Sequence, residues 1–146
     1  MLNRLFLACA LSICACATPA PVNDSRPSPK WHPTDSRGVL SSDGSYWVAY
    51  RALPTEVPLN SEFAVEFFVT APEARDVLLV PEVVVIDARM PGHGHGMIYG
   101  VSAELTGSGT YVARGMLFHM TGHWELYIDI TDGAWTERAQ FDIELE

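Results

Sequence analysis

Histidine and methionine are concentrated in one part of the chain. The sequence has five of each, and all except Met1 and His32 lie between Met90 and His123. Imidazole nitrogen and thioether sulfur both bind metals, and thioethers suit Cu(I), whereas imidazole binds copper in either oxidation state. The three cysteines lie elsewhere, within the first 16 residues. The chemistry that this region favours is therefore a soft or borderline metal ion held without thiolate, with copper as the first choice.

Two segments carry the candidate ligands. In the first, His93, His95 and Met97 alternate with glycines, so in an extended backbone the three side chains project to the same side. In the second, His119 and Met120 lie at a turn between two expected strands. We predict that these five residues are the metal ligands, provided that the two segments meet in the fold.

Zinc is the alternative metal. An all-imidazole site would use His93 and His95 with either His119 or His123, because zinc is commonly bound by histidine nitrogens. Calcium is disfavoured, since the carboxylates do not cluster in a loop of the type that calcium requires.

A reading without a metal also accounts for some of these residues. Methionine is flexible and fills irregular gaps in hydrophobic cores, so the glycine-rich segment can be a tight turn with Met97 and Met120 serving only to pack. We assign Met90 and Met116 to packing in either case.

The elements that must position the ligands read as β-strands. Period-2 alternation is clearest in residues 123–130, where Trp124, Leu126 and Ile128 share one face. Glycine-containing turns separate the apolar runs, and no run has a helical period. The expected strands are Tyr46–Arg51, Glu62–Thr70, Val83–Arg89, Ile98–Leu105, Thr110–Phe118, His123–Ile130 and Trp135–Leu145. Seven short strands in about 100 residues predict an all-β, immunoglobulin-like sandwich over residues 45–146.

The first 15 residues have the composition of a signal peptide. A positive residue, Arg4, precedes the apolar run 5–13, which is shorter than the roughly 20 residues of a transmembrane helix. An aliphatic and a small residue stand three and one positions before Cys16, as in a bacterial lipobox. We therefore expect a lipoprotein in which Cys16 is lipidated. Ordinary cleavage after Ala17, which would release a soluble periplasmic protein, is the alternative.

Residues 16–44 are expected to form a flexible linker between the lipid and the domain. They contain half of the ten prolines of the chain and show no apolar period. Alanine rather than aspartate after Cys16 favours sorting to the outer membrane. We thus expect the domain on the periplasmic side of the cell envelope, attached to the membrane through its lipid.

The net charge excludes one class of partner. The chain has 18 Asp and Glu residues against 9 Lys and Arg, a net charge of −9, so it lacks the basic face that nucleic acid requires. No Ser-His-Asp, Cys-His or phosphate-loop pattern is present either, so we expect a protein that is not an enzyme.

Three segments resemble the YtkA-like and FixH-like exported domains. They are residues 87–97 (DARMPGHGHGM), 109–111 (GTY) and 118–126 (FHMTGHWEL). Members of that group typically show a Met-Pro-rich segment with His or Met, a Gly-x-Tyr, and a closing Phe-x-Met-x-Gly-x-Trp. The positions that match are Met90, Pro91, His95, Met97, Met120, Gly122 and Trp124. The resemblance implies an exported immunoglobulin-like sandwich with a role near copper handling or respiratory-oxidase assembly.

Two functions follow from these observations. The first is a lipid-anchored domain that binds copper through the His/Met cluster and buffers it or delivers it to an acceptor. The alternative is a metal-independent interaction module of a cell-envelope or respiratory-complex assembly, because immunoglobulin-like sandwiches serve many binding roles.

Overall fold

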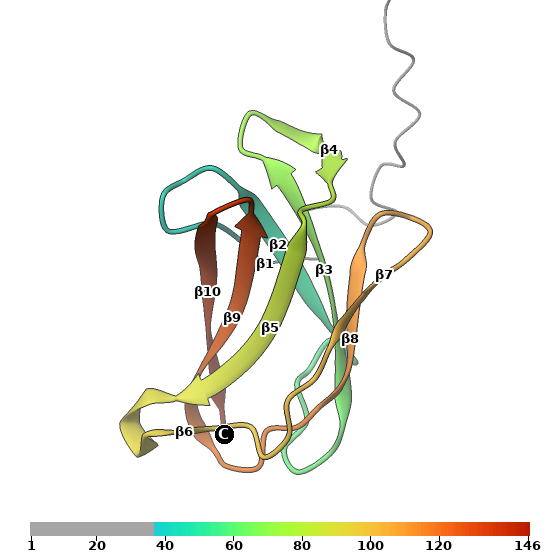
Figure 1. Ribbon diagram of the computed structural model, residues 1–146. Coiled ribbons are helices and arrows are strands. Elements are labelled where there is room, and N and C mark those ends of the chain that lie inside the picture. The colour runs from blue at the N-terminus through green and yellow to red at the C-terminus, as the bar shows by residue number, and fades with distance from the viewer. Residues whose placement is uncertain (1–36) are drawn as a thin grey trace, which may run out of the picture.

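The computed structural model describes residues 37–146, which form two antiparallel sheets packed as a β-sandwich (Figure 1). One sheet has the order β1-β2-β3-β8-β7, with β4 beside β3, and the other has the order β10-β9-β5-β6. The strands are β1 (Arg37–Leu40), β2 (Trp47–Leu53), β3 (Phe63–Ala71), β4 (Ala74–Leu79), β5 (Val83–Met90), β6 (His95–Gly96), β7 (Ala103–Leu105), β8 (Tyr111–Met116), β9 (Gly122–Asp132) and β10 (Trp135–Leu145). A 3-10 turn, η2 (Pro91–His93), joins β5 to β6.

The expected fold class is confirmed. The strands that correspond to the seven expected ones are β2, β3, β5, β7, β8, β9 and β10. Taken in chain order as A to G, they give the orders A-B-E-D and G-F-C in the two sheets, which is the arrangement of an immunoglobulin constant-type sandwich. The described residues contain no helix long and apolar enough to cross a lipid bilayer.

The N-terminal boundary of the sandwich differs from the expected one. Arg37–Leu40 pairs with β2, so the sheet includes these residues and does not begin at Ser45. Four residues are too few to show an alternation of apolar and polar side chains. One of them is Gly38, where the Trp47 ring occupies the space that a side chain would need. The signal peptide, Cys16 and the part of the linker before Arg37 lie outside the described residues.

Two further strands were not expected from the sequence, and one is shorter than expected. β4 has no apolar alternation, yet its Leu78 packs with Ala49 and Phe68 in a small cluster on the outer face of β2 and β3. β6 has only two residues. The run expected from Ile98 to Leu105 forms a strand only over its last three residues, because Gly100 and the residues around it form a loop.

The core lies between the sheets and follows the predicted alternation. Trp124, Leu126, Ile128 and Ile130 of β9 are fully buried, and Phe63, Val65, Phe67 and Val69 of β3 face them from the other sheet. A third face-sharing set, on β10, includes Ala139, Phe141 and Ile143. The inner faces of these strands are therefore apolar, and the outer face of β9 and β10 is largely polar and open to solvent.

A buried carboxylate fastens β10 to the turn between β1 and β2. Glu137 continues the inward face of β10 and is 8% exposed. Its Oε2 accepts hydrogen bonds from Ser41 Oγ at 2.6 Å, Ser45 N at 3.2 Å and Asp43 N at 3.3 Å. Burial acts to raise the pKa of Glu137, but these hydrogen bonds outweigh it and lower the pKa from its ordinary value of 4.5.

We expect Glu137→Gln to destabilise the domain by about 1–3 kcal/mol at neutral pH, because the amide replaces a charged acceptor of three hydrogen bonds. Urea unfolding measures the difference. A carboxyl whose pKa is lowered on folding stabilises the protein above its unfolded pKa, and this stabilisation is lost as the pH falls through the folded value. The difference in unfolding free energy between the variant and the parent should therefore become smaller below about pH 4.5. Glu104→Gln, at an exposed position of β7, is the control; equal unfolding midpoints for the two variants would contradict the assignment.

Candidate metal centre

The glycine-rich segment is a compact tip at one end of the sandwich (Figure 1). After β5 the chain turns through η2, and Gly94 adopts a left-handed conformation with φ +70°. β6 then pairs back on β5, with His95 opposite Met90. A side chain at Gly96 would stand 2.8 Å from the carbonyl oxygen of Ala88, so glycine is needed for this close return. The pairing places His95 on the same face as Met90, which points into the core.

The second segment is held by Trp124. Phe118 is fully buried and its ring stacks on the indole at a centroid distance of 4.3 Å. The indole Nε1 donates a hydrogen bond to the carbonyl oxygen of Met120 at 2.9 Å. These two contacts fix the backbone on either side of His119, between β8 and β9. Contacts of its two neighbours with Trp124 therefore fix the position of His119, although the residue lies between strands.

The two segments meet, which is the condition on which the predicted site depends. The ring centroids of His95 and His119 are 5.2 Å apart, and those of His93 and His95 are 5.7 Å apart. Both His95 and His119 contact Trp124 edge to face, at 6.4 and 5.6 Å. Two imidazoles that bind one tetrahedral ion at a nitrogen–metal distance of about 2 Å have centroids roughly 5 Å apart. The observed spacings are thus close to those of a shared centre.

The hydrogen bonds of the imidazole rings leave ring nitrogens that could bind a metal ion. Within residues 37–146, Nδ1 of His119 is the buried side-chain nitrogen or oxygen atom without a hydrogen-bond partner. His95 Nδ1 lies 3.3 Å from the carbonyl oxygen of Gly96, an interaction that leaves its Nε2 for another partner. An unpartnered buried polar atom is costly, and native proteins keep few of them. A cation is one partner that would satisfy the His119 nitrogen.

The nitrogens of the three histidines have not converged on one point. Among residues 37–146, the His, Cys, Asp and Glu group whose ligand atoms all lie within 4.8 Å of one another is a different one, His123, Glu125 and Asp142. His93 is exposed and flanked by Gly92 and Gly94, so its side chain can turn toward His95 and His119 without displacing core residues. Binding by all three imidazoles therefore requires a change of side-chain torsions.

The methionines divide as the sequence suggested. Met90 and Met116 are 1% and 0% exposed and belong to the core, which confirms their assignment to packing. Met97 and Met120 are only half-buried and pack against the edge of the core next to the histidine segments. This packing is compatible with either a structural or a ligand role.

His123 does not join this cluster. It precedes Trp124 on β9, so its side chain points to the opposite, outer face of the sheet. There Nδ1 is 2.7 Å from Glu144 Oε1, and Asp142 and Glu125 lie close to Nε2. The hydrogen bond to Glu144 and the neighbouring carboxylates raise the pKa of His123 above its ordinary value. Of the two candidates for a third imidazole ligand, His119 and not His123 contacts His95.

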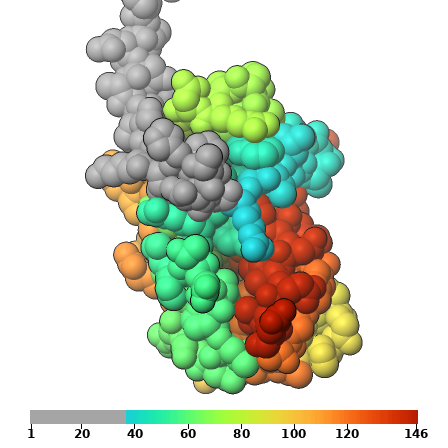
Figure 2. Space-filling model, turned by 180° about the vertical axis from the view of Figure 1, so that it is seen from behind, coloured from blue at the N-terminus to red at the C-terminus, as the bar shows by residue number. Residues whose placement is uncertain are grey.

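Two hollows of the surface relate differently to the histidines. A cavity of about 210 Å³ next to the tip is lined by His95 together with Arg89, Glu125 and Tyr127, among others. A larger groove of about 910 Å³ lies between the segment that follows β2 and the end of β10, which adjoin in Figure 2. Its lining contains none of the predicted ligands. Of these two hollows, the small cavity is the one that touches the candidate centre.

We expect His119→Phe to leave the metal-free protein as stable as the parent, or more stable by up to about 2 kcal/mol. Phenylalanine keeps the ring contact with Trp124 and removes the unpartnered buried nitrogen. Thermal and urea unfolding in the presence of a chelator measure this. His93→Ala, at the exposed tip, should change stability by less than about 0.5 kcal/mol. A loss of 2 kcal/mol or more in His119→Phe would mean that the imidazole has a structural role.

Comparisons with known proteins bear on the fold alone. No family profile matches the chain, and no curated protein matches it. Among solved structures, a crystal structure of a DUF4426 family protein from Pseudomonas aeruginosa PAO1 is similar, with a TM-score of 0.52 and 10% sequence identity. The similarity covers 78% of this chain and 97% of that chain. The resemblance to YtkA-like and FixH-like domains therefore stays a prediction, and what the chain shares with the DUF4426 protein is its β-sandwich fold.

Proposed function

We propose that this protein is a non-enzymatic, exported domain that binds a copper ion at the tip of the sandwich. His93, His95 and His119 are the nitrogen ligands, and Met97 and Met120 supply thioether sulfur. The observation that carries the proposal is the buried, unpartnered Nδ1 of His119 in a ring 5.2 Å from that of His95. A bound cation would supply the missing partner and account for two imidazoles packed together beside an indole.

Copper is preferred over zinc because of the sulfur donors. Zinc is bound mainly by thiolate, imidazole and carboxylate, whereas thioether sulfur favours Cu(I). Each of the two contacting segments carries a half-buried methionine next to its histidine or one glycine away. An imidazole–thioether site also contains no thiol that copper could oxidise, which suits an oxidising compartment.

The exposure of the site suits exchange of the ion. His93 is exposed and the tip that carries it is short and glycine-rich, while His119 is fixed by the core. An ion held between a fixed and an adjustable ligand can leave when a partner offers competing donors. This arrangement supports buffering or delivery rather than a permanently enclosed cofactor. A lipid on Cys16 would keep the exchange at the membrane surface on the periplasmic side.

Titration of the full mature chain with Cu(I) under anaerobic conditions tests the proposal. Trp124 contacts both His95 and His119, so binding should change tryptophan fluorescence with a stoichiometry of one ion per chain. His95→Ala/His119→Ala should weaken binding by about tenfold or more. His123→Ala is the matched control and should bind as the parent does. Equal Cu(I) affinity in the double variant and the control would refute the centre and favour a metal-independent interaction module.

The two methionines distinguish copper from zinc. We expect Met97→Leu/Met120→Leu to weaken Cu(I) binding by about tenfold or more and to leave Zn²⁺ binding at the same histidines unchanged, because leucine keeps the volume and removes the sulfur. Competition with chelators of known affinity gives both values. If the double variant binds both Cu(I) and Zn²⁺ as tightly as the parent, the methionines serve only in packing and zinc is the better assignment.

A further inference from the structure

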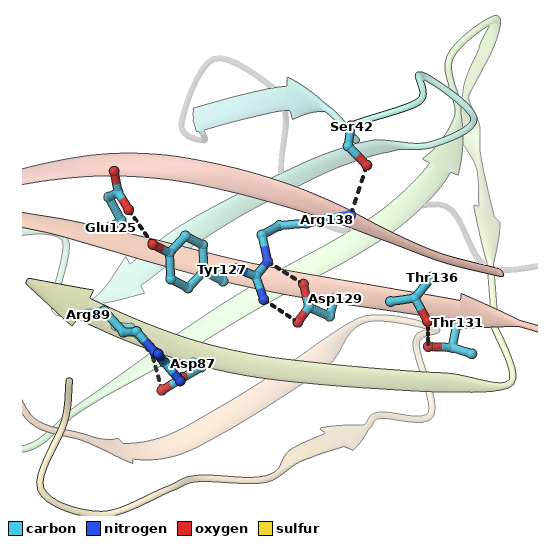
Figure 3. A network of polar contacts seen from close by, with 10 residues as sticks. Ser42, Asp87, Arg89, Glu125, Tyr127, Asp129, Thr131, Thr136 and Arg138 are labelled. Carbon is cyan, nitrogen blue, oxygen red and sulfur yellow. Dashed lines mark hydrogen bonds and ion pairs between the residues drawn. The ribbon is translucent and has the colours of Figure 1, made fainter. Parts of the chain in front are cut away.

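A second group of donor atoms lies on the outer face of the four-stranded sheet. Where β9 begins and β10 ends, His123 stands opposite Glu144, and Glu125 stands opposite Asp142. Period-2 alternation points all four side chains away from the core, toward solvent. Figure 3 shows this face, with Glu125 on β9 and its neighbour Tyr127. We refer to His123, Glu125, Asp142 and Glu144 as the outer cluster.

Three of these side chains bring one donor atom each to a common point. His123 Nε2 is 3.5 Å from Asp142 Oδ1 and 3.9 Å from Glu125 Oε1. All three donor atoms lie within 4.8 Å of one another, which the histidines at the tip do not achieve. Ligands of one metal ion stand at about this mutual separation, slightly contracted once the ion is bound.

The remaining contacts orient these donors toward the common point. His123 Nδ1 is hydrogen-bonded to Glu144 Oε1 at 2.7 Å, so a neutral imidazole carries its proton on Nδ1 and directs the lone pair of Nε2 toward Glu125 and Asp142. Histidines that bind metals usually donate their other nitrogen to a carboxylate in this way. The hydroxyl of Tyr127 donates to the second oxygen of Glu125, which leaves Oε1 free for an ion.

The outer cluster carries more negative charge than its surroundings balance. Three carboxylates surround one imidazole, and the arginines of the same sheet face are paired with other acids, Arg89 with Asp87 and Arg138 with Asp129. Arg37 reaches Asp142 at its backbone carbonyl oxygen and not at its carboxylate. Exchange of the single imidazolium proton for a divalent ion would neutralise more of this charge than the proton does.

We propose that His123, Glu125 and Asp142 form a second metal site, specific for a divalent ion of the zinc class and supported by Glu144 behind the imidazole. Imidazole nitrogen and carboxylate oxygen are both donors that zinc takes in proteins, and three protein ligands leave the fourth tetrahedral position open. The outer cluster has no sulfur donor, so it favours Zn²⁺ over Cu(I). Its ligands project from the face of β9 opposite Trp124, and it shares no ligand with the copper centre, although Glu125 and His95 line the same small cavity.

Zinc titration of the full mature chain in a His95→Ala/His119→Ala background isolates the outer cluster. We expect one Zn²⁺ per chain by calorimetry, and a change in the His123 imidazole nitrogen shifts in NMR that marks binding through Nε2. Asp142→Asn should weaken this binding by about tenfold or more. Asp87→Asn is the matched control, since it removes the same charge from the same sheet face without touching the cluster.

The outcomes separate the second site from the first. Loss of Zn²⁺ binding in Asp142→Asn but not in Asp87→Asn, with Glu144→Gln intermediate, supports the outer site. Equal weakening by both aspartate substitutions would show diffuse electrostatic attraction, and no Zn²⁺ binding in the background variant would show that His123 is only an ion-paired imidazolium; either result overturns the proposal. Cu(I) binding to the chain with intact His95 and His119 is unaffected by these results, so the two sites fail or stand separately.

Discussion

The packing of the Trp124 indole is the constraint on which the candidate centre depends. The ring is fully buried, stacks on Phe118 and donates its N–H to the carbonyl oxygen of Met120. His95 and His119 both contact it edge to face, so one side chain packs against donors that come from two segments distant in the sequence. The hydrogen bond also satisfies a backbone carbonyl at the rim of the core, where an unpaired group would be costly. Without the indole, the segment between β8 and β9 would lose both its packing partner and its main-chain anchor.

The tip depends on glycines, which allow its backbone to turn sharply and to lie close to β5. Gly96 allows β6 to lie against the carbonyl oxygen of Ala88, and Gly94 supplies the left-handed turn that reverses the chain. A side chain at either position would clash or strain the backbone, and His95 would then no longer stand opposite Met90. The rigid half of the site is therefore built by a large aromatic residue and the adjustable half by glycines.

The sequence predicts the strands that show a clear apolar period. It does not predict the strands and contacts that depend on which residues pair across the sheets. The alternation in β9 identified its buried face, because burial of one face imposes that pattern, and the turn residues between apolar runs separated the seven expected strands. β1 and β6 are too short to show it, and they are held by pairing with β2 and β5. The sequence left the meeting of His95 with His119 as a condition of the predicted site, since contact between distant segments depends on how the sheets pack. The unpartnered nitrogen of His119 carries no sequence signal, since it depends on what surrounds the ring.

The outer cluster shows the same limit in another form. His123 and Glu144 are 21 positions apart in the chain, and only the register of β9 against β10 makes them direct neighbours. Once that register is known, alternation along β9 sends Trp124 into the core and the residues on either side of it, His123 and Glu125, to solvent. Because thioethers belong among apolar side chains and carboxylates belong in water, the pleat that buries one set exposes the other. The alternation that buries Trp124 next to His95 and His119 therefore exposes His123 and Glu125, so the different donors of the two proposed sites follow from the hydrophobic pattern that folds the sheet.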